Sequence, residues 1–159
     1  MPYIALIRNL GKMGSIGLID TNLSPNTKYI ADKIIDHMAI AKSMVHPMQI
    51  LLAASTYASG HGVRGSLRWP VARIIVEALD QAFYMSFKNV EPTGKNFLLA
   101  LDVSGSMTAK IANTHLSARE ASAAMALVTA RTEPMHEMIG FTSGGWSSSG
   151  QKTRFSYFA

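Results

Sequence analysis

The hydrophobic pattern of the chain changes period at residues 97–107, which read FLLALDVSGSM. Five consecutive apolar residues, Phe97 to Leu101, are followed at once by a carboxylate and two hydroxyls. A short apolar run bounded by turn residues is typical of a strand buried on both faces of a parallel sheet. The Ala-rich stretch 118–132 then predicts a helix, and residues 138–141 predict a second strand. This order of elements indicates a βαβ unit.

The residues before this stretch follow a helical period instead. Helices are predicted over residues 1–11 (ended by Gly11 or Gly14), 27–42, 47–58 and 70–88. Pro47 and Pro70 are each placed in the first turn of a helix. Successive helical hairpins of this kind indicate a solenoid. The turn-rich residues 91–96 separate this helical part from the α/β part.

Composition excludes several classes of protein. The chain has 159 residues, of which 48% are hydrophobic and 16% charged, with no cysteine and a net charge of +5. So apolar a chain is not disordered, and without cysteine it has neither disulfides nor thiolate chemistry. No apolar run approaches the roughly 18 residues of a membrane span, and no secretory signal precedes the first helix. We therefore expect a soluble, cytoplasmic, mildly basic protein that has no membrane partner.

Asp102, Ser104 and Ser106 form the chemically most distinctive constellation. They occupy alternate positions after a predicted buried strand, at the edge of the sheet where ligands gather in α/β folds. A carboxylate and two hydroxyls are hard oxygen ligands that suit Mg²⁺, with water completing the octahedron. Gly105 is expected to let the backbone turn so that both hydroxyls face one point. The alternative is that these side chains only cap the next helix and its approach loop.

Basic residues gather in the helical part. No acidic residue lies between Asp36 and Glu77, whereas Arg64 and Arg68 lie there beside the aromatic residues Tyr57 and Trp69 and a Gly-rich loop. Such a combination is suited to phosphate contact and base stacking. The alternative is a solvated loop whose arginines pair with helix carbonyl ends or with acidic residues elsewhere. Arg64, Arg68 and Lys12 are the predicted RNA-binding residues.

No catalytic constellation stands out. The sequence contains no Ser-His-Asp order, no paired carboxylates and no phosphate loop. A hydrolase that uses Asp102 is disfavoured because no base or nucleophile accompanies it. We therefore predict that the protein is not an enzyme.

The loop from Asp102 to Ser106 resembles the metal-ion-dependent adhesion site (MIDAS) of von Willebrand factor A domains. In that site an Asp and two Ser are joined by a Thr and an Asp from later loops, which are not identifiable here. The resemblance therefore implies a divalent cation, Mg²⁺, held in a site that is incomplete in this chain.

A longer resemblance covers most of the chain up to Met107. It is carried by MPYIALIRNLGKM (1–13), VHPMQILLAASTYASGHGVRG (45–65) and ALDQAFYMSFKNVEPTGKNFLLALDVSGSM (78–107). These segments resemble the Ro autoantigen (TROVE) family, whose members are rings of HEAT-like helical repeats closed by a von Willebrand A domain. The resemblance implies a partial chain. Residues 1–92 would be the C-terminal part of the helical-repeat domain, and residues 93–159 the N-terminal part of the von Willebrand A-like domain.

The resemblance also implies a function. Family members bind small non-coding Y RNAs and the single-stranded ends of misfolded RNAs, and in bacteria they are associated with exoribonucleases in RNA processing and quality control. We accordingly expect a ribonucleoprotein component whose partners are small non-coding RNA and an exoribonuclease, with no DNA partner. The alternative is a metal-dependent protein-interaction module in which the Asp102 loop presents Mg²⁺ to a partner's carboxylate.

Overall fold

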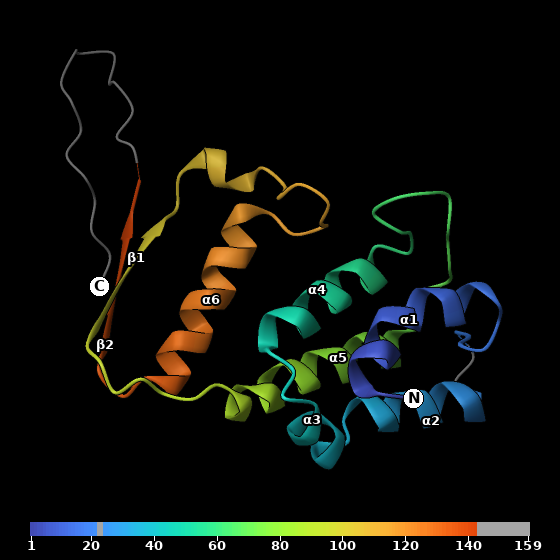
Figure 1. Cartoon of the computed structure of the whole chain (residues 1–159). Helices are drawn as coiled ribbons and strands as arrows, with labels where there is room; N and C mark the ends of the chain where they lie inside the picture. Colours follow the sequence, from blue (N-terminus) through green and yellow to red (C-terminus); the bar gives the residue numbers. More distant parts are fainter. Residues whose placement is uncertain (22–23, 143–159) are drawn as a thin grey trace, which may run out of the picture. The chain divides into compact units, whose positions relative to one another are not determined.

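The computed structural model describes residues 1–21 and 24–142, and Figure 1 shows the path of the chain. The contacts divide it into two compact units. The first is Met1–Glu91 together with the short segment Ala112–Leu116, and the second is Pro92–Ile111 together with the chain from Ser117 on. The first unit is helical and the second is α/β. The predicted fold class, helical repeats followed by a partial α/β domain, is therefore confirmed.

The first unit is built around one central helix. Its elements are α1 (Tyr3–Ser15), α2 (Pro25–Ile34), α3 (His37–Ser43), α4 (Pro47–Ala58), α5 (Arg73–Met85) and the 3₁₀ helix η1 (Ser86–Asn89). Helix α5 contacts α2, α3 and α4, and its Ile75, Leu79 and Ala82 are fully buried. The apolar stripe of α5 therefore forms the centre of the core.

The predicted helix over residues 27–42 is wrong, because two helices occupy that range. Helix α2 ends at Ile34, and the carboxylate of Asp36 accepts hydrogen bonds from the backbone N–H groups of Met38 and Ala39 at 3.0 and 3.1 Å. Asp36 is thus the N-cap of α3. The break turns Met38 away from the predicted apolar face, and its side chain is 79% exposed.

The predicted helix starts are partly correct. Helix α4 spans Pro47–Ala58 as predicted, with the Nδ1 atom of His46 accepting a hydrogen bond from the Met48 N–H. Helix α5 begins at Arg73 rather than Pro70, because the preceding Ala72 has extended backbone and donates its N–H to the Tyr57 hydroxyl at 3.2 Å.

The second unit contains a parallel βαβ arrangement, as predicted. Strands β1 (Phe97–Asp102) and β2 (His136–Phe141) pair in parallel, with Phe97 opposite His136 and Asp102 opposite Phe141. Between them runs α6 (Ala118–Thr132), which contacts both strands. A capping box between Ser117 and Glu120 starts this helix.

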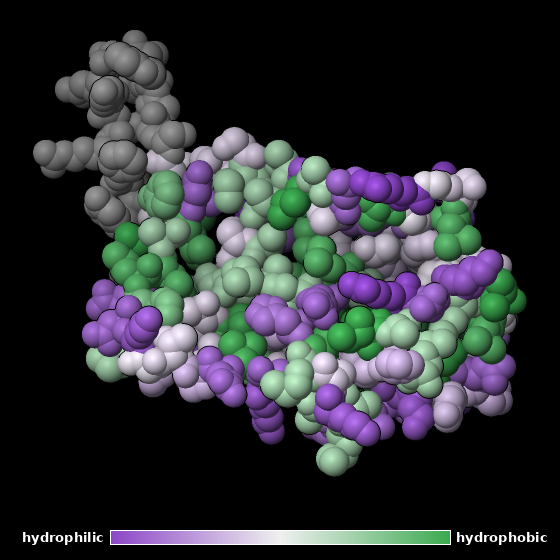
Figure 2. Space-filling view, viewed as in Figure 1, coloured by the Kyte–Doolittle hydropathy of each residue, from purple (hydrophilic) through white to green (hydrophobic). Residues whose placement is uncertain are grey.

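One prediction about β1 is wrong. Within the described residues the strand is not buried on both faces, since Leu98 is 64% exposed, and Figure 2 shows hydrophobic residues at the surface over the strands. Helix α6 covers one face of a two-stranded sheet, and the described chain has no element for the other. Phe155, Tyr157 and Phe158 alternate with polar residues, a pattern that predicts a further strand, but these residues lie outside the described part of the chain.

Glu133 anchors the start of the second unit. Its carboxylate accepts hydrogen bonds from the backbone N–H groups of Thr93 at 2.7 Å and Gly94 at 3.1 Å. The hydrogen bond from Thr93 is the main reason that the pKa of Glu133 lies below its ordinary value.

In the described part of the chain, no helix has the length and apolar character needed to cross a membrane.

Candidate nucleic-acid interface

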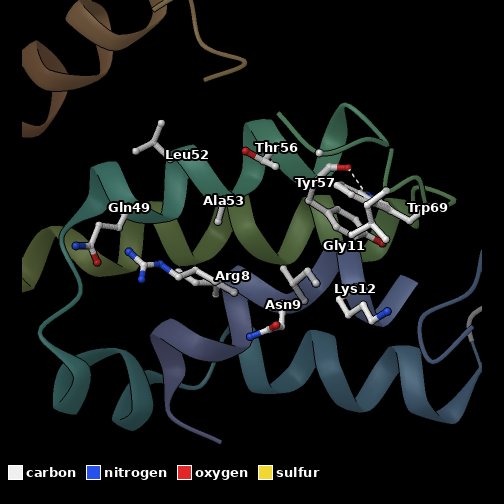
Figure 3. Close-up of a pocket in the computed structure, with 14 residues that line it drawn as sticks. Arg8, Asn9, Gly11, Lys12, Gln49, Leu52, Ala53, Thr56, Tyr57 and Trp69 are labelled. Atoms are coloured by element: carbon white, nitrogen blue, oxygen red, sulfur yellow. Dashed lines mark hydrogen bonds between the residues drawn. The ribbon is translucent and has the colours of Figure 1, made fainter. Parts of the chain in front are cut away.

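A groove of about 480 Å³ runs between α1 and α4 in the helical unit. We call it the α1–α4 groove. Its walls are residues 7–12 of α1 and residues 49–57 of α4, and its end is formed by Gly62, Leu67 and Trp69 of the following loop. Figure 3 shows the side chains that line it.

Two cations lie on the α1 side of the groove. Arg8 and Lys12 are one helical turn apart, are exposed, and extend from α1 in Figure 3. Neither forms an ion pair among the described residues, where the only salt bridge joins Arg73 to Glu77 at 2.7 Å. Residues 1–19 and 37–76, which include every residue of the groove, contain no Asp or Glu. The groove is therefore an electropositive concavity.

Lys12, a predicted RNA-binding residue, lies in this groove, whereas Arg8 and Gln49, which also line it, were not predicted. The signal for Arg8 was present in the sequence, as a second cation four residues from Lys12 in an acid-free stretch. Gln49 had no such signal, because only the packing of α4 beside α1 brings its amide to the groove.

The other two predicted RNA-binding residues lie in the loop after α4. The guanidinium of Arg64 donates from Nε and Nη2 to the Oδ1 atom of Asn113 at 3.1 and 2.8 Å. Arg68 is exposed, and its backbone pairs with that of His61 across the loop. The groove takes Gly62 and Leu67 from this loop but neither arginine.

The aromatic residues expected to stack on bases are core residues instead. Tyr57 is 1% exposed and Trp69 is 8% exposed, and the Trp69 indole donates from Nε1 to the Tyr57 carbonyl oxygen at 2.9 Å. Their rings stack on each other with centroids 6.3 Å apart. The suggestion that Tyr57 and Trp69 offer free stacking faces is therefore wrong.

The predicted end of α1 at Gly11 or Gly14 is wrong, and the position of Trp69 explains the two glycines. The helix runs through Gly11 and Gly14 to Ser15, and both glycines face the indole. A Cβ atom on Gly11 would lie 2.6 Å from the indole, and one on Gly14 would lie 2.9 Å from the Trp69 Cβ. These glycines permit a close approach and do not end the helix.

The predicted metal residues come together at the carboxyl end of β1. Asp102 accepts a hydrogen bond from the Ser104 N–H at 2.8 Å, and the Ser104 and Ser106 hydroxyl oxygens are 3.0 Å apart. The hydrogen bond from Ser104 lowers the pKa of the Asp102 carboxyl, which keeps it ionised. Gly105, which begins the 3₁₀ helix η2 (Gly105–Thr108), does not adopt a positive φ, so the turn does not require a glycine.

These three side chains fit the donor set of a hard cation, as one carboxylate and two converging hydroxyls. They do not make a complete site, because the described residues contain no cluster of three or more His, Cys, Asp or Glu side chains. Arg119 adds a constraint, since its guanidinium donates to the backbone carbonyl oxygens of Ser104 and Val103 at 3.2 and 3.5 Å. Arg119 of α6 therefore holds the loop through backbone carbonyl oxygens, and not through the side-chain oxygens of Asp102, Ser104 and Ser106.

Comparisons with known proteins match both units. The sequence model of the TROVE domain matches residues 1–59, and that of the Ro60 vWA domain matches residues 96–154. The predicted domain ranges 1–92 and 93–159 stay a prediction, since residues 60–95 fall between the two matches.

Two relatives carry the name RNA-binding protein RO60. The chain is 40% identical over 141 residues to the one from Caenorhabditis elegans and 42% identical over 139 residues to the one from Deinococcus radiodurans. These alignments cover 89% and 86% of this chain, but only 22% and 26% of the relatives. The chain therefore spans about a quarter of the length of these relatives.

The fold agrees with a solved relative. The crystal structure of the Deinococcus radiodurans RO (RSR) protein superposes with a TM-score of 0.82 at 40% identity, covering 87% of this chain and 28% of that one. Two family domains in the expected order, relatives about 40% identical and a shared fold lead to one conclusion: the chain belongs to the Ro (TROVE) family.

Proposed function

We propose that this protein binds RNA through its helical unit, as a ribonucleoprotein component of Ro type that has no catalytic activity. The observation that carries the proposal is the α1–α4 groove, where Arg8 and Lys12 face walls without any acidic residue. In Figure 2 hydrophilic residues lie beside hydrophobic ones on the surface over these helices. The relatives named as RNA-binding proteins support RNA as the polyanion.

The mechanism is electrostatic capture of phosphates. Lys and Arg side chains that neutralise phosphates release condensed counterions, so affinity falls steeply with salt. Such contacts hold the backbone of the nucleic acid but do not read its sequence. The expected ligands are small non-coding RNA and the ends of misfolded RNA, with no preference for DNA duplexes.

Salt titration of RNA binding by the whole chain tests this proposal. A fluorescein-labelled oligouridylate of about ten nucleotides is titrated by anisotropy at several salt concentrations. The double variant Arg8→Gln/Lys12→Gln should bind more weakly and reduce the slope of log K against log salt by about 0.7 for each lost phosphate contact.

A matched double variant is Lys28→Gln/Lys33→Gln on α2. It removes the same charge away from the groove, since neither lysine lines it, and Lys33 lies over the ring of Tyr29 at 5.6 Å from its centroid. Equal losses for the two double variants would show that net charge alone drives binding and would refute the proposed interface.

We further propose that Asp102, Ser104 and Ser106 hold a divalent cation, Mg²⁺, when later parts of the domain complete its ligands. The bound ion would supply a positive charge and open coordination positions at the end of β1. Its fit rests on the converging oxygens of the loop. The metal-dependent protein-interaction module is not favoured, because the relatives are named for RNA binding.

A cytoplasmic location and an exoribonuclease partner complete the proposal. The composition supports the cytoplasmic location and the family resemblance supports the exoribonuclease partner, and neither rests on a contact seen in this chain. Fractionation of cells that produce the protein, followed by affinity purification with and without ribonuclease treatment, tests both points. Co-purification of an exoribonuclease only while RNA is intact would indicate a bridge through RNA.

A further inference from the structure

We propose that the α1–α4 groove is a pocket for one unpaired nucleotide of the RNA. This inference rests on the proposed function and adds that the groove, beyond its surface charge, encloses a base. Its volume of about 480 Å³ lies within the range of roughly 300–1,000 Å³ that is usual for small-ligand sites. A single nucleotide is a ligand of this class, whereas a duplex is too wide to enter.

The charged side chains and the neutral polar side chains lie on different walls of the groove, which matches the separation of phosphate and base in a nucleotide. Arg8 and Lys12 on α1 offer positive charge to a phosphate. Gln49 and Thr56 on α4 offer an amide and a hydroxyl, and neither side chain has a hydrogen-bond partner within the described chain. Amides and hydroxyls read the edges of unstacked bases in single-stranded RNA.

Apolar surface is available for the face of the base. Leu52 on α4 and Leu67 in the loop line the groove, and each is 38% exposed. Exposed leucines within a hollow gain from contact with a flat, poorly hydrated ring. Phosphate, base edge and base face therefore each have complementary groups in the same groove.

The shape of the groove is set by the core beneath it. The indole of Trp69 fills the space over Gly11 and is held by its hydrogen bond to the Tyr57 carbonyl. Since Tyr57 belongs to α4 and Gly11 to α1, this contact fixes the spacing of the two helices. A pocket formed in advance loses little conformational entropy on binding.

A groove-filling substitution separates this inference from surface electrostatics. Ala53 lines the groove on α4, so Ala53→Leu reduces its volume without changing any charge. We expect oligouridylate affinity to fall about tenfold, with an unchanged salt slope. Ala58→Leu is the matched control, because Ala58 lies on the same helix, is exposed and does not line the groove.

A second pair of variants tests the pocket even if Ala53→Leu fails to fold. Gln49→Ala and Thr56→Val add no volume, and each should weaken oligouridylate binding about threefold to tenfold while the helical circular dichroism stays unchanged. Normal affinity in Ala53→Leu, Gln49→Ala and Thr56→Val would overturn the pocket. If Arg8→Gln/Lys12→Gln still weakened binding, the proposed function would survive that result.

Competition by an acidic peptide gives the remaining outcome. Suppose that polyglutamate with the same net charge as the oligouridylate displaced it, and that Ala53→Leu weakened the binding of both ligands equally. The groove would then be a peptide site, and the nucleotide assignment would be wrong. Failure of polyglutamate to compete, combined with the loss in Ala53→Leu, supports a nucleotide pocket. Absence of any RNA binding by the unmodified chain would instead refute the proposed function itself.

Discussion

The indole of Trp69 lies against Gly11 of α1, so close that a Cβ atom on Gly11 would stand 2.6 Å from Cζ3 and 2.7 Å from Cη2. This contact joins α1 to the loop after α4 and lies directly beneath the α1–α4 groove. The ring cannot withdraw freely, because its Nε1 atom donates to the Tyr57 carbonyl oxygen at 2.9 Å. One interior contact therefore supports both the core and the groove.

Gly11→Ala should destabilise the protein. Alanine favours a helix over glycine by about 1 kcal/mol, but overpacking against a rigid ring costs about 1–3 kcal/mol. Since three indole atoms lie within 3.0 Å of the added carbon, the steric cost should dominate. The urea midpoint, followed by circular dichroism, should decrease. Gly105→Ala is the control, because its added Cβ meets nothing within 4 Å, and an equal decrease there would contradict this explanation.

Stability should fall at alkaline pH because of two buried tyrosines. Tyr3 donates its hydroxyl proton to the Ile34 carbonyl oxygen at 2.8 Å, and burial raises its pKa well above the ordinary 10.0. Burial likewise raises the pKa of Tyr57, against the smaller opposing effect of the Ala72 hydrogen bond. Above pH 10 the unfolded chain loses these protons before the folded chain does, so the free energy of unfolding decreases as pH rises.

Urea midpoints at about pH 9 and about pH 11 measure this effect. Tyr3→Phe removes one of the two groups and should reduce the difference between the midpoints. Tyr29→Phe is the matched control, since Tyr29 is exposed. If both variants kept the full difference, Tyr3 would not be its source.

Glu133→Gln should loosen the start of the α/β unit. The carboxylate accepts from both Thr93 and Gly94, whereas a glutamine has only one acceptor oxygen. Amide hydrogen exchange at Thr93 and Gly94, measured by NMR, should become faster. Glu137→Gln, an exposed change on β2, should leave both amides protected.

The same carboxylate predicts an acid response. Because the folded pKa of Glu133 lies below its ordinary 4.5, its contribution to stability is present above pH 4.5 and is lost as pH falls through the folded value. Exchange of the Thr93 and Gly94 amides should therefore accelerate in that acidic window. An exchange ratio between the native protein and Glu133→Gln that stayed constant through the window would argue against this linkage.

Asp102→Ala should weaken Mg²⁺ binding by about tenfold or more, measured by isothermal titration calorimetry of the protein together with the later loops that complete the site. The reason is that Asp102 is the only carboxylate of the candidate loop, and its hydrogen bond orders the loop. RNA binding should persist in this variant, because the proposed interface lies in the other unit. Asp80→Ala, on the exposed side of α5, is the control. Identical Mg²⁺ heats with and without Asp102→Ala in that completed protein would refute the metal site.

Local signals predicted those elements whose boundaries depend on neighbouring residues. Pro47 marks the start of α4 through backbone geometry, and the Ala-rich stretch 118–132 predicted α6, which the structure places at Ala118–Thr132. The break at Asp36 was missed because Ile34, Ile35 and Met38 continue a helical period on paper. The competing N-cap hydrogen bonds of Asp36 override that period in the structure.

The sequence by itself determined the order of the elements, the acid-free helical part and the alternation of Asp102, Ser104 and Ser106, because each depends on residues close together in the chain. Only the tertiary structure decided that Trp69 is buried on Gly11 and that Arg8 shares a groove with Gln49. Gly11 and Trp69 are 58 positions apart in the chain, and Arg8 and Gln49 are 41 positions apart. The physical cause of both relationships is the packing of helices, in which a glycine admits an indole that no other side chain at that position would allow.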